Sequence, residues 1–319
     1  MSRQEMLADP RTAGKVKINR PEGFRRGHSV FRVVGESLTK FFSRLDVPEE
    51  SRRNIAEAAN LWMSGMDEWD FVRHESHADG PLIGPTLATV LPEMADATFF
   101  LMGDRVLQER VEGLFAGNYP EVRIPQPPDP EKDNGNRDPK KDRQLLMQAA
   151  DAIPKVVAIG RVAMVFPEGT RSRTGKLGFG IPQIVHYLTD NAFVLPMLFD
   201  GSRERWPVGE KPHFRGRRIT AIVGKPVLVK DIRAEIANFA KAEGITITKQ
   251  EEQGLMMNAI IRKHIAPLEP NPEDRGVYQD IDLSLKEELV IVKERIACEA
   301  EARKQKMVKD DARRIGAVA

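Results

Sequence analysis

Two residues suited to acid–base chemistry stand five positions apart: His74 and Asp79, in the run His-Glu-Ser-His-Ala-Asp. An imidazole takes up a proton near neutral pH, and a carboxylate that accepts its other N–H fixes its tautomer. At about 100° per residue, this spacing places the two side chains about 140° apart on a helix, so they cannot share a helix face. We therefore expect His74 on a loop and Asp79 as the cap of the following helix. His77 has no acid at the matching spacing, and we interpret it as a surface or supporting residue.

A second cluster of polar residues follows an apolar segment at 162–166 and reads Pro-Glu-Gly-Thr-Arg-Ser-Arg. Residues 156–159 and 162–166 are short apolar runs rich in β-branched residues, and we predict both as buried strands. Open α/β sheets bind ligands at the carboxyl ends of their strands. There, Arg171 and Arg173 would present two guanidinium groups, which meet phosphate oxygens bidentately. A basic turn by itself is usually only solvated, but the position of this one after a strand favours a binding site. The sequence therefore predicts a phosphate site here.

Three motifs in this order resemble those of the glycerolipid acyltransferases, the family of glycerol-3-phosphate and lysophosphatidate acyltransferases. The first is His74-x-x-x-x-Asp79, the second is the segment 166–175, and the third is the apolar-proline run at 193–198. Their order makes the signal stronger than any one motif alone. The resemblance covers roughly residues 70–230.

The resemblance implies a role for each matching residue. His74 is the general base, Asp79 orients it, and Arg171 and Arg173 hold the acceptor phosphate. Arg123 stands where the family has an apolar pair followed by Arg, and is assigned to the same phosphate. The substrate loop comprises Glu168, Gly169, Thr170 and Ser172.

The implied reaction moves a fatty acyl group from acyl-CoA or acyl-carrier protein to the sn-1 hydroxyl of glycerol-3-phosphate, with no cofactor. Residues 103–107 resemble the soluble plastid-type enzymes and favour that acceptor. Two departures from the family pattern bear on the acceptor: Arg73 replaces the usual Asn, and the motif around Arg123 is degraded. The alternatives are a lysophosphatidate acyltransferase and a non-catalytic phospholipid-binding relative. The presence of both His74 and Asp79 argues against the latter.

Composition restricts the class of protein. The chain has 319 residues, of which 41% are hydrophobic and 30% charged, as in globular proteins. No apolar run reaches the roughly 18 residues that span a bilayer, and the first residues lack a secretory apolar segment. The single cysteine, Cys298, excludes an internal disulfide, and the six histidines show no metal-site spacing. We expect a cytoplasmic protein, peripheral on the inner membrane face, without a metal.

The expected fold class is α/β, with a glycerol-3-phosphate acyltransferase-like domain of mixed sheet and flanking helices over 67–232. Ahead of it we expect a basic flexible arm over 1–27 and a small helical cap over 28–66. A C-terminal helical extension covers 233–319. The arm is a candidate contact for an anionic membrane surface. The basic-aromatic segment 203–218 is a candidate contact for lipid head groups, for a coenzyme A phosphate or for an acidic carrier protein. No nucleic-acid-binding signature accompanies them, so we expect no nucleic-acid partner.

Periodicity and turn residues predict the individual elements. Further strands are expected at 69–73, 98–102, 193–199 and 219–227. Helices are expected at 29–45, 48–62, 79–91, 144–152, 181–188 and 248–266, the last opened by a capping box at Thr248 and Glu251. A final helix carries an apolar stripe formed by Leu285, Leu289, Val292 and Ile296. That stripe requires a partner surface, and the charged part beyond Cys298 is expected to project or fray.

Overall fold

The computed structural model describes residues 24–25, 45–76, 78–103, 121–125, 138–167, 184–207, 218–271, 273 and 282–316. The strands are β1 (Phe24–Arg25), β2 (Leu45–Asp46), β3 (Asp67–Val72), β4 (Thr98–Gly103), β5 (Glu121–Ile124), β6 (Val162–Val165), β7 (Ala192–Asp200), β8 (Ile219–Val223) and β9 (Val227–Leu228). The helices are α4 (Glu49–Met63), α5 (Asp79–Ala88), α6 (Pro92–Ala97), α9 (Pro139–Ala158), α11 (Ser202–Arg205), α12 (Val229–Glu243), α13 (Lys249–Ala259), the π-helix η2 (Ile260–Ile265), the 3-10 helix η3 (Ala266–Leu268) and α14 (Leu285–Gly316).

The strands form one mixed, mostly parallel sheet. Its order is β1-β5-β4-β6-β3-β7-β8-β2, and β9 pairs with β7 beside this path. The five neighbours from β5 to β7 are parallel, whereas β7 pairs antiparallel with β8 and β9. The expected α/β class with a mixed sheet is confirmed. Because the central strands are parallel, the carboxyl ends of β3, β4, β5 and β6 lie at one edge of the sheet.

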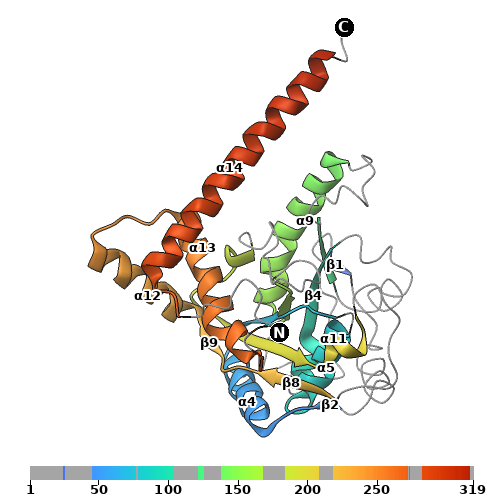
Figure 1. Cartoon of the computed structure of the whole chain (residues 1–319). Helices are drawn as coiled ribbons and strands as arrows, with labels where there is room; N and C mark the ends of the chain where they lie inside the picture. The colour runs from blue at the N-terminus through green and yellow to red at the C-terminus, as the bar shows by residue number, and fades with distance from the viewer. Residues whose placement is uncertain are drawn as a thin grey trace.

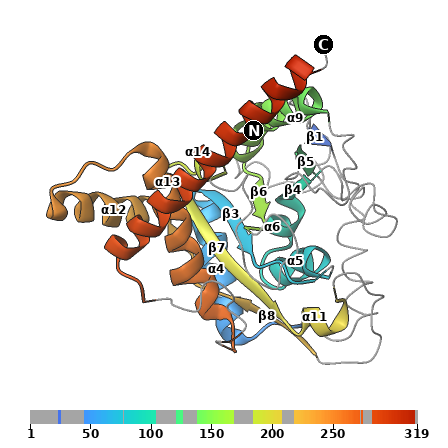
Figure 2. The same ribbon diagram turned by 45° about the horizontal axis from the view of Figure 1, so that its top comes forward.

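Helices cover both faces of the sheet, because strand residues alternate between them. On β3, Trp69 and Phe71 face a core shared with α9, α12, α13 and α14, whereas Val72 faces a second core shared with α4, α5 and α6. In Figure 1 the sheet lies between α4 below and α9 above. Figure 2 shows β7 running through the middle of the molecule with β3 and β6 beside it.

Helix α4 confirms the expected helix at 48–62, with Glu49 and Glu50 in its first turn. It packs directly on the sheet, against β8 and β3. Asn54 donates a 2.8 Å hydrogen bond to the carbonyl of Val223, whose N–H donates to Ser51 Oγ at 3.0 Å. Helix α4 of the predicted cap therefore belongs to the layer that covers one sheet face. Of the predicted helix at 29–45, residues 29–44 lie outside the described residues, and Leu45 belongs to strand β2 instead.

Residues 156–159 were predicted as a strand, and that prediction is wrong. They continue or follow α9, which runs from Pro139 to Ala158 and is much longer than the predicted helix at 144–152. Ala149, Ile153 and Val156 recur on its buried side at helical spacing. A four-residue apolar run fits a strand or a buried helix turn equally well. The helical spacing of the buried residues from Ala149 to Val156 shows that this run belongs to the helix.

The C-terminal helices pack on the α9 side of the sheet. The predicted capping box is confirmed: Thr248 Oγ1 accepts from the N–H of Glu251, and Glu251 Oε2 accepts from the N–H of Thr248 at 2.7 Å. The predicted strand 219–227 is divided into β8 and β9, both paired with β7. Of the predicted helix at 181–188, residues 181–183 lie outside the described residues; in the described part only Ile184 and Val185 are helical, and a turn follows them.

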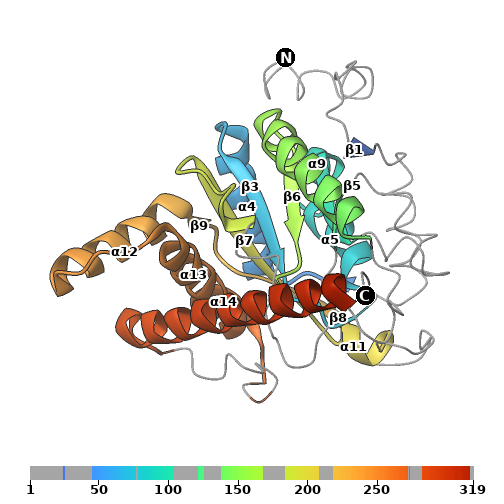
Figure 3. The same cartoon turned by 90° about the horizontal axis from the view of Figure 1, so that it is seen from above.

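The predicted apolar stripe of the last helix finds its partner on this chain. Leu289 and Val292 of α14 are buried, and Leu285 and Ile296 pack around them. A Cβ on Gly254 of α13 would lie 2.5 Å from Val292 Cγ1, so the two helices meet there without room for a side chain. The rest of α14 extends away from the domain, as Figure 1 shows, and Figure 3 shows α14 next to α13 from above.

Candidate active site

His74 and Asp79 lie at the edge of the sheet formed by the carboxyl ends of the parallel strands. Strand β3 ends at Val72, and the N–H of Arg73 still donates to the carbonyl of Met197 on β7, at 3.1 Å. His74 therefore stands on the loop just beyond the strand. Helix α5 begins at Asp79, with Ala78 at the cap position. The predicted loop and helix start are confirmed, with Asp79 one position inside the cap.

The two side chains form a hydrogen-bonded pair. His74 Nδ1 lies 3.3 Å from Asp79 Oδ2. The same oxygen accepts the N–H groups of Glu75 at 2.7 Å and Ser76 at 2.8 Å. The Asp79 side chain is 1% exposed and that of His74 is 19% exposed. The backbone thus fixes the carboxylate, which in turn holds a partly accessible imidazole. When Nδ1–H donates to Asp79, Nε2 is the basic nitrogen.

An aromatic ring supports the imidazole from the neighbouring strand. Phe166 directly follows β6, and its ring stacks on His74 with centroids 4.1 Å apart and planes inclined by 26°. The cause is strand order, because Phe71 of β3 is level with Val165 of β6. Phe166 is part of the motif that carried the resemblance, yet sequence reasoning gave it no role. An aromatic residue at the end of a strand next to the histidine's strand would have been the signal.

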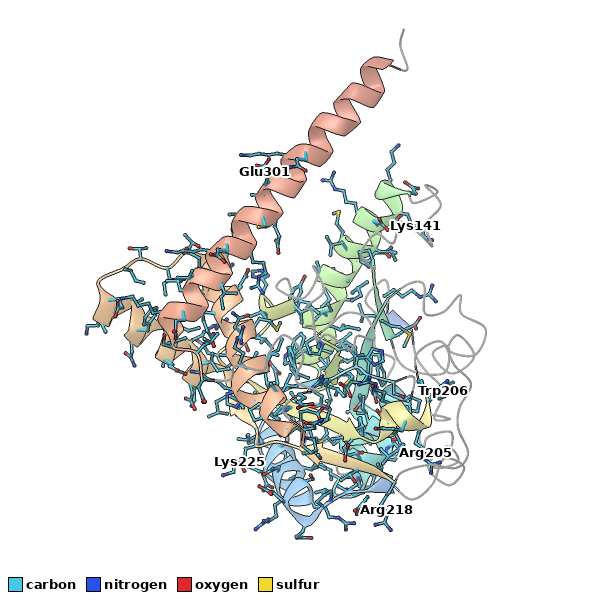
Figure 4. All side chains as sticks on the ribbon, in the orientation of Figure 1. Lys141, Arg205, Trp206, Arg218, Lys225 and Glu301 are labelled. Carbon is cyan, nitrogen blue, oxygen red and sulfur yellow. The ribbon has the colours of Figure 1, made fainter. Side chains whose placement is uncertain are left out.

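Ser76 fastens the loop to the segment after β7. Its Oγ donates to the carbonyl of Trp206 at 2.8 Å and accepts from the N–H of Ala78 at 3.0 Å. Trp206 follows the short helix α11, where Figure 4 labels it beside Arg205. The motif at 193–198 forms β7, which pairs with β3 in parallel and carries this segment to the site. Sequence reasoning did not find the contact between Ser76 and Trp206.

Two carboxylates contact Arg73, the residue before the histidine. Arg73 Nη2 lies 2.8 Å from Glu75 Oε1, and Arg73 Nη1 donates to Glu269 Oε2 at 3.2 Å. Burial raises the pKa of Glu75 to about 7. Arg73 opposes that rise, while the negative charges of Asp79 and Glu269 add to it. Arg73, the departure from the family pattern, thus has two carboxylate partners in this chain.

Arg123 lies apart from the pair. It stands on β5, and both β4 and β6 separate that strand from β3. Its Nε donates to Glu121 Oε1 at 2.9 Å, and the Glu121 side chain is buried. The structure therefore gives Arg123 an acidic partner without bringing it to His74. A role toward phosphate stays a prediction.

The predicted substrate loop lies outside the described residues. This holds for Glu168, Gly169, Thr170, Arg171, Ser172 and Arg173, and also for His77. The chain is described up to Pro167, directly after the residue that stacks on His74. The loop therefore starts at the candidate site.

Neither comparison with known proteins assigns the chain: no family model matches it, and no curated protein matches it. Within the part of the chain that the structure describes, no group of three or more His, Cys, Asp or Glu side chains could hold a metal ion. In the same part, no helix has the length and apolar character needed to cross a membrane.

Proposed function

We propose that this protein is an acyltransferase that moves a fatty acyl group from a thioester to the sn-1 hydroxyl of glycerol-3-phosphate. The observation that carries the proposal is the His74–Asp79 pair. Asp79 Oδ2 is held by two backbone N–H groups and faces His74 Nδ1 at 3.3 Å. A fixed carboxylate behind a partly exposed imidazole is the arrangement that a general base needs.

The proposed reaction uses this geometry. The Nδ1–H of His74 donates to Asp79, and Nε2 removes the proton of the acceptor hydroxyl as its oxygen attacks the thioester carbonyl. Asp79 stabilises the imidazolium that forms. Collapse of the tetrahedral intermediate breaks the carbon–sulfur bond, and the imidazolium returns the proton to the thiolate. The acceptor hydroxyl takes the place of an enzyme nucleophile, so the step needs neither an acyl-enzyme nor a cofactor.

Arg171 and Arg173 are the proposed holders of the acceptor phosphate, with Arg123 as a third candidate. The support is positional: Phe166 stacks on His74, and the arginine loop follows it within a few residues. A phosphate bound there would present its glycerol hydroxyl near the imidazole. The donor is acyl-CoA or acyl-carrier protein, and the proposed location is cytoplasmic, peripheral on an anionic membrane surface.

The test is thioester release by purified protein, with glycerol-3-phosphate and lysophosphatidate compared under one acyl donor. We expect a higher kcat/KM with glycerol-3-phosphate and almost no turnover in His74→Ala. A preference for lysophosphatidate would correct the acceptor. Absence of release with either acceptor, by folded wild-type protein and with both donors, would instead indicate a non-catalytic phospholipid-binding protein.

A further inference from the structure

A residue far along the chain reaches the candidate active site. Glu269 follows η3, and its Oε2 accepts a hydrogen bond from Arg73 Nη1 at 3.2 Å across 196 positions of sequence. The side chains are only 4% exposed for Arg73 and 8% exposed for Glu269. Breaking a buried ion pair leaves an uncompensated charge, so this contact is strongly constrained.

Glu269 is itself held in place by its own segment. Its Oε1 accepts from the N–H of Asn271 at 3.3 Å, and its N–H donates to the carbonyl of Ala266 at 3.2 Å. The preceding Leu268 docks on the sheet at Gly224. A Cβ on Gly224 would lie 3.2 Å from Leu268 Cδ2 and 2.8 Å from Pro196 Cγ. The end of η3 thus rests against Gly224, beside Pro196 of β7, and directs Glu269 toward Arg73.

Arg73 transmits this restraint to both sides of the histidine. It directly precedes His74, and its Nη2 pairs with Glu75 at 2.8 Å, directly after His74. The N–H of Glu75 is one of the donors that hold Asp79 Oδ2. The Arg73 guanidinium therefore connects Glu269 to Glu75, and Arg73 and Glu75 are the two residues that flank His74. Through the N–H of Glu75, the connection reaches the carboxylate of Asp79.

We propose that Glu269 is a positioning residue for the acyl transfer, acting through Arg73 to hold the His74–Asp79 turn. The inference rests on the proposed function for its catalytic meaning, although the contacts do not depend on it. A displacement of about 1 Å at a reacting group lowers rates by about a hundredfold. Loss of Glu269 would remove one of the two carboxylates that the buried Arg73 contacts, and would allow the turn to shift.

Hydrogen exchange tests the restraint without any assay of activity. The amides of Glu75 and Ser76 donate to Asp79 and should exchange slowly in wild-type protein. We expect exchange in peptides covering 73–79 to accelerate at least tenfold in Glu269→Ala. The matched control is Glu243→Gln, which removes the surface pair between Glu243 and Lys286 in the same C-terminal region. Unchanged exchange at 73–79 in folded Glu269→Ala would overturn the proposal.

Steady-state kinetics test the catalytic meaning. Glu269→Ala should lower kcat about ten- to a hundredfold, while the acceptor KM stays within about twofold. Glu269→Gln keeps the shape of the side chain and should fold even if the alanine variant does not. Its kcat should lie between those of the wild type and Glu269→Ala. Arg73→Lys keeps the charge but lacks the two-armed guanidinium, so it should also lower kcat.

The hydrogen-exchange and kinetic measurements test the positioning role of Glu269 and the proposed acyltransferase function separately. A kcat of Glu269→Gln and Arg73→Lys equal to that of wild type would overturn the positioning role. Wild-type protein that releases no thioester with any donor would overturn the proposed function, and the exchange measurement would still decide whether Glu269 restrains the turn.

Discussion

The imidazole of His74 stacks on the ring of Phe166, with centroids 4.1 Å apart, although the two residues follow different strands. The contact joins two motifs that are far apart in the sequence, the histidine–aspartate pair and the segment that leads into the arginine loop. It follows from the pairing of β3 with β6, which places the residues after these strands side by side. Several consequences of this site can be measured.

The base and its orienting acid give the first prediction. His74→Ala should abolish nearly all turnover in folded protein. Asp79→Asn should lower kcat by about 10² to 10⁴, because the imidazole loses the carboxylate that fixes its tautomer. Circular dichroism controls for folding. An active His74→Ala together with an inactive His77→Ala would show that the base is assigned to the wrong histidine.

The stacked ring gives the second prediction. Phe166→Leu keeps an apolar side chain but removes the aromatic face beneath His74. A stacked pair contributes about 0.5–1.5 kcal/mol beyond its burial, so kcat/KM should fall about two- to tenfold. Phe100→Leu is the matched control, because it makes the same substitution in the ring next to Phe166, with centroids 6.5 Å apart. Equal losses in both variants would count against a specific role for the stack.

The arginine loop gives the third prediction. Arg171→Ala and Arg173→Ala should each raise the KM for the acceptor about ten- to a hundredfold, since a charge-assisted hydrogen bond contributes roughly 1.5–3 kcal/mol. The KM for the thioester should change far less. Inorganic phosphate should inhibit the wild type by competing with the acceptor, and it should inhibit the variants less. An unchanged acceptor KM would remove the residue concerned from the phosphate site.

The contact between α13 and α14 gives the fourth prediction. Gly254→Ala should lower the free energy of unfolding by about 1–3 kcal/mol, because the new Cβ would lie 2.5 Å from Val292 Cγ1. Denaturant unfolding measures the change. Val292→Ala removes the opposing methyl groups, so the double variant should lose less stability than the sum of the single variants. Additive losses would contradict a direct clash.

Glu288 of α14 gives a prediction for pH dependence. Its side chain is fully buried, and burial raises its pKa to about 7, although Arg262 and Lys263 oppose the rise. Nearby Glu235 adds to it. A raised folded-state pKa for an acid means that the folded protein holds the proton more tightly than the unfolded chain. The contribution of Glu288 to stability is therefore largest below its unfolded pKa and is lost as pH rises to about 7, with no further change above.

The measurement compares the free energy of unfolding of wild type and Glu288→Gln between pH 4.5 and 8. Relative to Glu288→Gln, the wild type should lose at most about 3 kcal/mol of unfolding free energy as the pH rises to 7. Above pH 7 the difference between the two proteins should stay constant. Glu294→Gln is the matched control, because Glu294 is an exposed acid on the same helix. A difference that does not vary with pH would show that Glu288 does not titrate in this range.

Features set by residues close in sequence were predicted well. The spacing of His74 and Asp79 required a loop followed by a helix start, and the structure has both. Thr248 and Glu251 close the predicted capping box, and short, largely apolar runs predicted β3, β4 and β7. Val156 to Ile159 were misassigned, because a short apolar run satisfies two kinds of buried element and only packing distinguishes them.

By itself, the sequence determined the local geometry: which residues turn, which begin a helix, and which side of an element is apolar. These features depend on backbone sterics and on hydrogen bonds between residues a few positions apart. Tertiary structure alone decided that Phe166 stacks on His74 and that Glu269 reaches Arg73. Such contacts depend on strand order and on the docking of η3 against Gly224, beside β7, which residue spacing does not encode because packing between distant segments is a property of the whole domain.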